Sequence, residues 1–192
     1  MRTYSSIGLA LLMVLGSIFT ISADTTAVDH FTFARPPAAP ESTVDLKGRL
    51  SVAIERWSSD TERDQLTAGL AQSGPDKLLD ALRDVPNAGR MYWPGGTLYD
   101  VRYARKITRP DGSTDAVFVI DRPLWLWWES KPASTPYPYS VIQVRLGKDG
   151  AGEGRASFGI PVTSDKALGV VLSDYAKAPA VLTDVRHERP TT

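Results

Sequence analysis

Alternation of apolar and polar residues dominates the chain after residue 43. In TVDLKGRLSVAIERW the even positions from Val44 to Ile54 are apolar except Gly48, and this period of two is typical of a strand with one buried face. The glycine at position 48 is typical of a bulge in such a strand. A second alternating stretch, TLYDVRYARKI, predicts a strand with Tyr99, Val101, Tyr103 and Ile107 on one face and Asp100, Arg102 and Lys106 on the other.

Three turn sequences predict hairpins between such strands. RPDGST is followed by the partner strand DAVFVID, and its proline and glycine supply the backbone angles that a tight turn needs. The glycine-rich turn GKDGAGE predicts a second hairpin between YSVIQVRL and GRASFGI. The segment AKA predicts a third hairpin between ALGVVLSDY and PAVLTDVRH.

One stretch has helical instead of alternating periodicity. Ser59 and Glu62 have the spacing of a capping box, in which each residue satisfies a backbone amide of the first helical turn. SGPDKLLDALRDVP predicts a second helix that is capped by Ser73 or Gly74 and closed by Pro86. We expect this helical hairpin to pack against a sheet.

These elements predict a mainly β (α+β) fold, an antiparallel β-sandwich or partly closed barrel with an N-terminal helical hairpin insert. Residues 43–188 are expected to form a single globular β-rich domain. Residues 24–42 contain many proline, alanine and small polar residues and are expected to form a flexible spacer. Residues 189–192 are expected to be a disordered tail.

The first 23 residues have the pattern of a secretory signal peptide. Arg2 precedes an uncharged apolar run at residues 7–21, and small residues follow it up to Ala23. This run is shorter than the roughly 20 residues that a membrane span needs. We therefore expect a secreted or periplasmic protein, cut after Ala23 and without stable membrane insertion after the cut. Cleavage after Ala27 and an uncleaved anchor are the alternatives.

Composition excludes several function classes. The chain has no cysteine, so thiolate metal sites, thiol nucleophiles and redox roles are excluded. Without the signal peptide, 21 basic side chains oppose 22 acidic ones, which argues against nucleic acid as a partner. His30 lies in the expected spacer, and His187 is expected to be a titrating surface residue. Neither has the companions of a metal site, so no metal and no cofactor are expected.

The densest aromatic feature is LWLWW at residues 124–128. On a strand, Trp125 and Trp127 point to one side while Leu124, Leu126 and Trp128 point to the other. One interpretation is a strand covered on both sides, as the preceding AVFVI, apolar at both parities, also suggests. Another is a ligand surface formed by Trp125, Trp127, Tyr137 and Tyr139, for a carbohydrate, a peptide or an apolar ligand. A membrane-surface contact is a third.

No catalytic motif stands out, so we expect a non-catalytic exported binding or structural module. There is no G-x-S-x-G elbow, and GKDGAGEG is flanked by strands instead of opening a helix on a phosphate. The alternative is a glycosidase-like, carboxylate-dependent hydrolase acting outside the cytoplasm. Asp121 and Glu129, on either side of the tryptophan run, would be its paired carboxylates.

Across SVIQVRLGKDGAGEGRASFGI and VVLSDYAKAPAVLTDVR the chain resembles small exported bacterial proteins with no assigned activity. The resemblance covers roughly the last third of the chain. It supports a bacterial exported protein, and it implies no ligand, partner or catalytic residue.

Overall fold

The computed structural model describes residues 29–34, 48–73, 75–92, 98–124, 137–158, 161–178 and 180–188. These residues form ten strands and two helices. The strands are β1 (Asp29–Ala34), β2 (Leu50–Ile54), β3 (Gly89–Tyr92), β4 (Tyr99–Thr108), β5 (Thr114–Ile120), β6 (Ser140–Leu146), β7 (Ala151–Phe158), β8 (Val162–Asp165), β9 (Gly169–Leu172) and β10 (Ala180–Glu188). The helices are α1 (Asp60–Ser73) and α2 (Pro75–Asp84).

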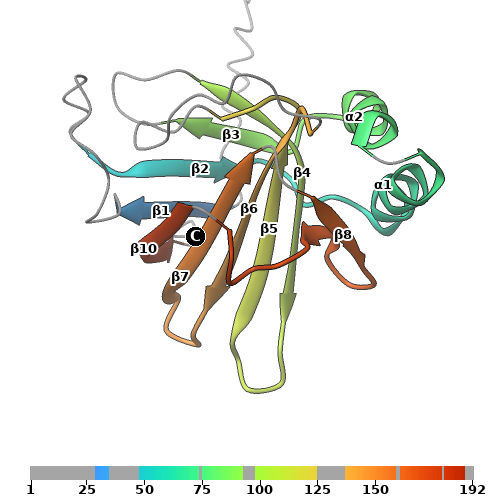
Figure 1. Ribbon diagram of the computed structural model, residues 1–192. Coiled ribbons are helices and arrows are strands. Elements are labelled where there is room, and N and C mark those ends of the chain that lie inside the picture. The colour runs from blue at the N-terminus through green and yellow to red at the C-terminus, as the bar shows by residue number, and fades with distance from the viewer. Residues whose placement is uncertain are drawn as a thin grey trace, which may run out of the picture.

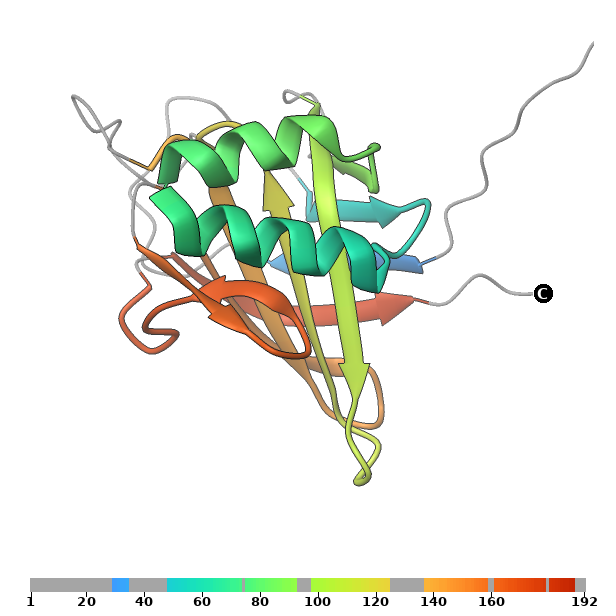
Figure 2. The ribbon, with the colours of Figure 1, turned by 90° about the vertical axis from the view of Figure 1, so that its right-hand side faces the viewer.

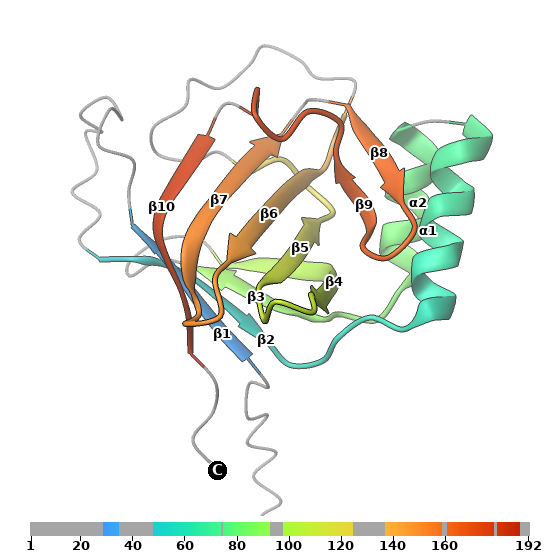
Figure 3. The ribbon, with the colours of Figure 1, turned by 90° about the horizontal axis from the view of Figure 1, so that it is seen from below.

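Eight of the strands form a closed antiparallel barrel in the order β1-β10-β7-β6-β5-β4-β3-β2 (Figures 1 and 3). From β2 to β7, neighbours in sequence are also neighbours in the barrel. β1 lies between β2 and β10 and closes the ring. The predicted mainly β, antiparallel fold with a helical hairpin is confirmed, and its barrel is fully closed.

The prediction of a flexible spacer is wrong for residues 29–34. These residues form β1, and Phe31 and Phe33 are fully buried in the barrel interior. The physical reason is pairing at long range, since β1 hydrogen-bonds to residues on β2 and to the far end of the chain on β10. A strand of six residues beside a proline-rich stretch offers little local signal of this pairing.

Side chains from all eight strands fill the barrel interior, as expected for a barrel of this size. Phe31 and Phe118 meet edge to face at 4.9 Å between ring centroids. Fully buried aliphatic residues surround them, among them Leu50, Val52, Ile54, Val101, Ile120, Ile142, Val144, Leu182 and Val185. This interior core is separate from the apolar layer outside the barrel.

The two helices and the β8–β9 hairpin form that outer layer over β4, β5 and β6 (Figure 2). Leu66, Leu78 and Leu82 of the helices and Val170 and Leu172 of β9 pack on outward-facing residues of the barrel. β5 is consequently buried at all seven positions. The coverage of AVFVI on both sides, expected from its sequence, is confirmed.

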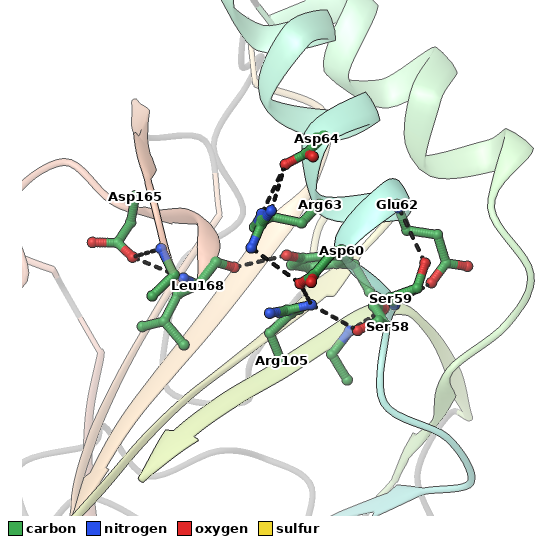
Figure 4. A network of polar contacts seen from close by, with 12 residues as sticks. Ser58, Ser59, Asp60, Glu62, Arg63, Asp64, Arg105, Asp165 and Leu168 are labelled. Carbon is green, nitrogen blue, oxygen red and sulfur yellow. Dashed lines mark hydrogen bonds and ion pairs between the residues drawn. The ribbon is translucent and has the colours of Figure 1, made fainter. Parts of the chain in front are cut away.

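Polar contacts anchor α1 to the barrel (Figure 4). The predicted capping box is present: Glu62 N donates to Ser59 Oγ at 3.2 Å, and Ser59 N donates to Glu62 Oε2 at 2.7 Å. Arg105 on β4 pairs with Asp60 at 2.9 Å. Tyr103 donates its hydroxyl hydrogen to the Leu168 carbonyl at 2.8 Å and so ties β4 to the β8–β9 hairpin.

Two of the three predicted hairpins are confirmed. Gly112 and Gly150 adopt positive φ in the β4–β5 and β6–β7 turns. The third prediction is wrong, because β9 pairs with β8 and β10 pairs with β7 and β1. β8 is the polar sequence VTSD, which shows no apolar alternation from which a strand could be predicted.

Candidate functional site

The four aromatic residues predicted to contact a ligand lie in different surroundings. Trp125 and Trp127 are outside the described residues, and Leu124, the last described residue of their run, is fully buried. Tyr139 is buried beneath the outer layer, where burial and then Tyr137 raise the pKa of its hydroxyl. Tyr137 is half-buried, and its ring centroid lies 6.3 Å from that of Tyr139. A ligand surface built on these residues stays a prediction.

Of the two carboxylates of the hydrolase hypothesis, the structure describes one. Asp121 accepts a hydrogen bond from Arg102 Nε at 3.0 Å, and its side chain is 15% exposed. Glu129 lies outside the described residues. The separation that would distinguish a glycosidase pair is therefore not defined, and the hypothesis stays a prediction.

A polar cluster lies inside the barrel, centred on Asp29 of β1, which is 4% exposed. Its Oδ1 lies 2.6 Å from His187 Nε2. Its Oδ2 accepts hydrogen bonds from Lys106 Nζ at 2.6 Å and from Trp57 Nε1 at 2.8 Å. We call Asp29, Trp57, Lys106 and His187 the interior polar cluster.

The prediction that His187 is a titrating surface residue is wrong. Its side chain is 6% exposed, and its ring stacks on Phe31 with centroids 4.4 Å apart and an interplanar angle of 4°. The pairing of β10 shifts register between Leu182 and Val185. Val185 thereby faces the interior core, and His187, two residues later, faces the same way.

A second register shift places Lys106 in the cluster. The pairing of β4 with β5 shifts between Val101 and Tyr103, so Val101 and Ala104 both face the interior. Tyr103 belongs instead to the outer layer, and the prediction that it shares a face with Val101 is wrong. Lys106, two residues after Ala104, therefore reaches the carboxylate inside the barrel.

Burial by itself raises the pKa of Asp29, because the ionised carboxylate loses its hydration. Hydrogen bonds from Lys106, His187 and Trp57 outweigh that effect and hold its pKa below the usual value. An ionised carboxylate only accepts hydrogen bonds, so Nε2 of His187 carries a proton. Since donors of the chain already engage both carboxylate oxygens, the cluster joins strands and presents no free carboxylate to a ligand.

The outer face of the barrel changes from apolar to charged along its strands. Register aligns three rows of outward-facing residues across β4, β5, β6 and β7. From the covered end they are Tyr103–Val119–Val141–Ser157, Arg105–Val117–Gln143–Arg155 and Ile107–Asp115–Arg145–Glu153. The outer apolar layer packs on the first rows, so the charged residues gather at its border.

Arg145 is one of the charged residues at this border that have no ion pair among the described residues. It has no hydrogen bond or ion pair with any described residue, although Asp115 and Glu153 face it across the neighbouring strands. Its guanidinium carbon lies 3.9 Å from the ring centroid of Tyr175, and that of Arg155 lies 5.7 Å from the same centroid. We call Arg145, Arg155 and Tyr175 the arginine–tyrosine face.

A hollow of about 540 Å³ lies at Arg145. Its lining also contains Arg109, Ser113, Asp115, Leu146 and Gly147. Arg109 Nε donates to Asp115 Oδ2 at 3.1 Å, so these two charges offset each other. The charge that the lining leaves unpaired is that of Arg145.

Three buried polar atoms at the arginine–tyrosine face and next to it have no hydrogen-bond partner among the described residues. They are Arg155 Nε, Ser157 Oγ and Tyr175 Oη. Burial, followed by the nearby charge of Glu153, raises the pKa of Tyr175 to about 12, so its hydroxyl keeps its proton at neutral pH. All three groups can donate, and each buried donor without a partner costs on the order of 1–3 kcal/mol.

Comparisons with known protein families, curated proteins and solved structures found no match to this chain. Within the described ranges, no group of three or more histidine, aspartate or glutamate residues is arranged to hold a metal ion. Neither of the two described helices is long and apolar enough to cross a membrane. The function must therefore be inferred from the geometry of the two polar sites.

Sequence reasoning missed both sites for different reasons. The polar residues at odd positions of β6 and β7, from Gln143 to Arg155, were visible as one solvent-facing side of a hairpin. Tyr175 gave no such signal, because its segment was predicted to belong to a hairpin that does not form. The interior polar cluster depends on two register shifts, which alternation cannot reveal.

Proposed function

We propose that this protein is a non-catalytic, exported binding module whose ligand contacts the arginine–tyrosine face and the adjoining hollow. The proposal places it outside the cytoplasm because of the apolar run at residues 7–21. The observation that carries the binding site is the guanidinium of Arg145, which has no ion pair among the described residues and lies at a hollow. An arginine of this kind recognises carboxylate, phosphate or sulfate groups.

The charge of the face narrows the ligand classes suggested by the sequence. Carbohydrates and peptides can carry an anionic group, whereas a purely apolar ligand offers Arg145 no partner. Stacking on Tyr175 holds the guanidinium in one orientation, which reduces the entropy lost when a ligand binds. The face therefore favours an anionic carbohydrate or peptide group over an uncharged one.

The test is isothermal titration calorimetry of the full chain with inorganic phosphate, citrate and glucuronate, each at low ionic strength. We expect saturable binding of at least one probe and a loss of about tenfold in affinity for Arg145→Gln, since a charge-assisted contact is worth roughly 1.5–3 kcal/mol. Arg83→Gln is the matched control, because Arg83 is exposed in the last turn of α2, away from this face.

Equal affinity of the wild type and Arg145→Gln for every probe would refute this site. Absence of saturable binding in the wild type would refute the recognition of anions altogether. Unfolding midpoints of both variants show whether either substitution acts through stability instead of contact.

A further inference from the structure

We propose that the group bound at this face is a doubly charged oxyanion, of the phosphate or sulfate type, held jointly by Arg145 and Arg155. Ser157 and Tyr175 supply neutral donors to the same oxygens. This inference rests on the proposed function and specifies the chemistry of its ligand.

The buried polar atoms at this face all lack the same kind of partner, a hydrogen-bond acceptor. Arg155 Nε, Ser157 Oγ and Tyr175 Oη are buried and without a described partner. Each of them can donate a hydrogen bond, and the guanidinium of Arg145 adds only further donors. A group that accepts several hydrogen bonds and donates none complements such a set, which is the property of an oxyanion.

Two positively charged side chains lie beside Tyr175 at this face. Both guanidinium groups flank one ring, at 3.9 Å for Arg145 and 5.7 Å for Arg155. No described carboxylate forms an ion pair with either arginine: Asp115 is engaged by Arg109, and Glu153 faces Arg145 across β6 and β7 without bonding to it. Two guanidinium groups that form no ion pair with a described carboxylate match one dianion better than a single carboxylate.

The positions of these residues along β6 and β7 bring them to one face of the barrel. Arg155 and Ser157 are two residues apart on β7, so their side chains emerge on the same outer face. Arg145 lies diagonally opposite Arg155 on β6 and also lines the hollow. The anionic group therefore sits over the two arginines, and the remainder of the ligand extends into the hollow. A phosphate monoester has this two-part form and carries two negative charges above its second pKa of about 6, whereas a sulfate ester carries one.

The experiment compares the affinities of the full chain for three probes: acetate, inorganic phosphate above pH 7.5, and sulfate. Sulfate is included because its charge does not change with pH in this range. Wild-type protein should bind phosphate and sulfate about tenfold more tightly than acetate, because the dianions engage both arginines. Arg155→Gln should reduce this preference to about twofold or less while leaving acetate binding at Arg145 unchanged.

Tyr175→Phe provides a variant that keeps the ring beneath both guanidinium groups and removes only the hydroxyl. It should weaken phosphate and sulfate binding by about tenfold or more, the value of one hydrogen bond to a charged group. A difference in affinity between phosphate and sulfate would show which of the two oxyanions the site prefers. The unfolding midpoint of each variant shows whether weaker binding comes from a lost contact or from a destabilised fold. Arg83→Gln is again the control.

The outcomes are distinguishable. If Arg145→Gln weakens binding as expected but Arg155→Gln leaves the preference for dianions intact, the shared site is refuted and the proposed function stands. If Arg155→Gln has the expected effect, both are supported. If no probe binds to the wild type, water satisfies the buried donors, and both proposals fail.

Discussion

At the scale of single residues, the most consequential side chain is a carboxylate inside the barrel. Asp29 connects β1 with three segments that are distant in sequence. Its partners come from β4, from β10 and from the residues after β2. A buried charge is tolerated only when it is paired, and both oxygens of Asp29 have donors. Its contribution to stability must therefore depend on its ionisation.

Replacing Asp29 by asparagine should lower the free energy of unfolding by about 2–3 kcal/mol at pH 7, because Lys106 loses its counterion inside the barrel. Denaturant unfolding measures this. Asp84→Asn is the control, since Asp84 is an exposed residue at the end of α2. A change equal to that of the control would show that the interior polar cluster contributes nothing.

The same carboxylate predicts acid sensitivity with a definite sign. The pKa of Asp29 is lower in the folded protein than its usual value of 3.8. The stability that it contributes is therefore fully present above the unfolded pKa and is lost as pH falls through the folded pKa. Between pH 5 and pH 2 the wild type should lose more stability than Asp29→Asn. Parallel curves of midpoint against pH would contradict this.

At the scale of elements, irregular backbone positions decide where side chains point. The register shifts in β4 and β10 turn Lys106 and His187 inward, and Asp184 adopts a φ of 46° within the irregular part of β10. Gly169 adopts a φ of 85° at the start of β9, close to the hydroxyl of Tyr103. The β8–β9 hairpin thus docks on β4 through a position that only glycine fits.

Two glycine substitutions separate backbone strain from steric overlap. Gly112→Ala, with φ of 84° and only Lys148 Cβ within 3.2 Å of the added carbon, should lose about 1 kcal/mol of stability. Gly169→Ala has the same φ penalty, but its Cβ would also overlap Tyr103 Oη. It should lose about 2 kcal/mol more, in the range of overpacked cores. Equal losses of unfolding free energy for the two variants would show that Tyr103 moves aside at little cost.

At the scale of the whole molecule, closure of the barrel determines which residues are buried. β1 is hydrogen-bonded on both sides, so its loss would leave β2 and β10 with unpaired edges. The outer layer covers only part of the barrel surface, and the arginine–tyrosine face lies at its border. Closure of the barrel buries the interior polar cluster, and the partial coverage of its outer surface leaves the arginine–tyrosine face at the border of the outer layer.

A chain that begins at Thr43, the domain boundary predicted from sequence, should fail to fold. It lacks Phe31 and Phe33, whose burial contributes roughly 2–3 kcal/mol each, together with both hydrogen-bonded ladders of β1. This loss is comparable with the 5–15 kcal/mol of a typical domain. A chain that begins at Val28 should fold. Cooperative thermal unfolding of the shorter chain would refute the structural role of β1.

Local features of the sequence determined much of the fold. The capping box of α1 and the turns at Gly112 and Gly150 involve residues within a few positions of one another, so their patterns could be recognised directly. The burial of β5 on both faces also followed from its uninterrupted apolar residues. These properties depend on short-range geometry and on hydrophobicity, both of which are set by the residues of the segment itself.

Only the tertiary structure decided the rest, because the partners concerned are far apart in the chain. β1 is a strand because β2 and β10 bind it, and Asp29 meets His187 across 158 positions. Register shifts reversed the faces of Lys106 and His187, which alternation alone had placed outward. Arg145 likewise looks like an ordinary surface charge in sequence. Its significance arises from packing, which brings Tyr175 against it, while Asp115 and Glu153 on the neighbouring strands form no ion pair with it.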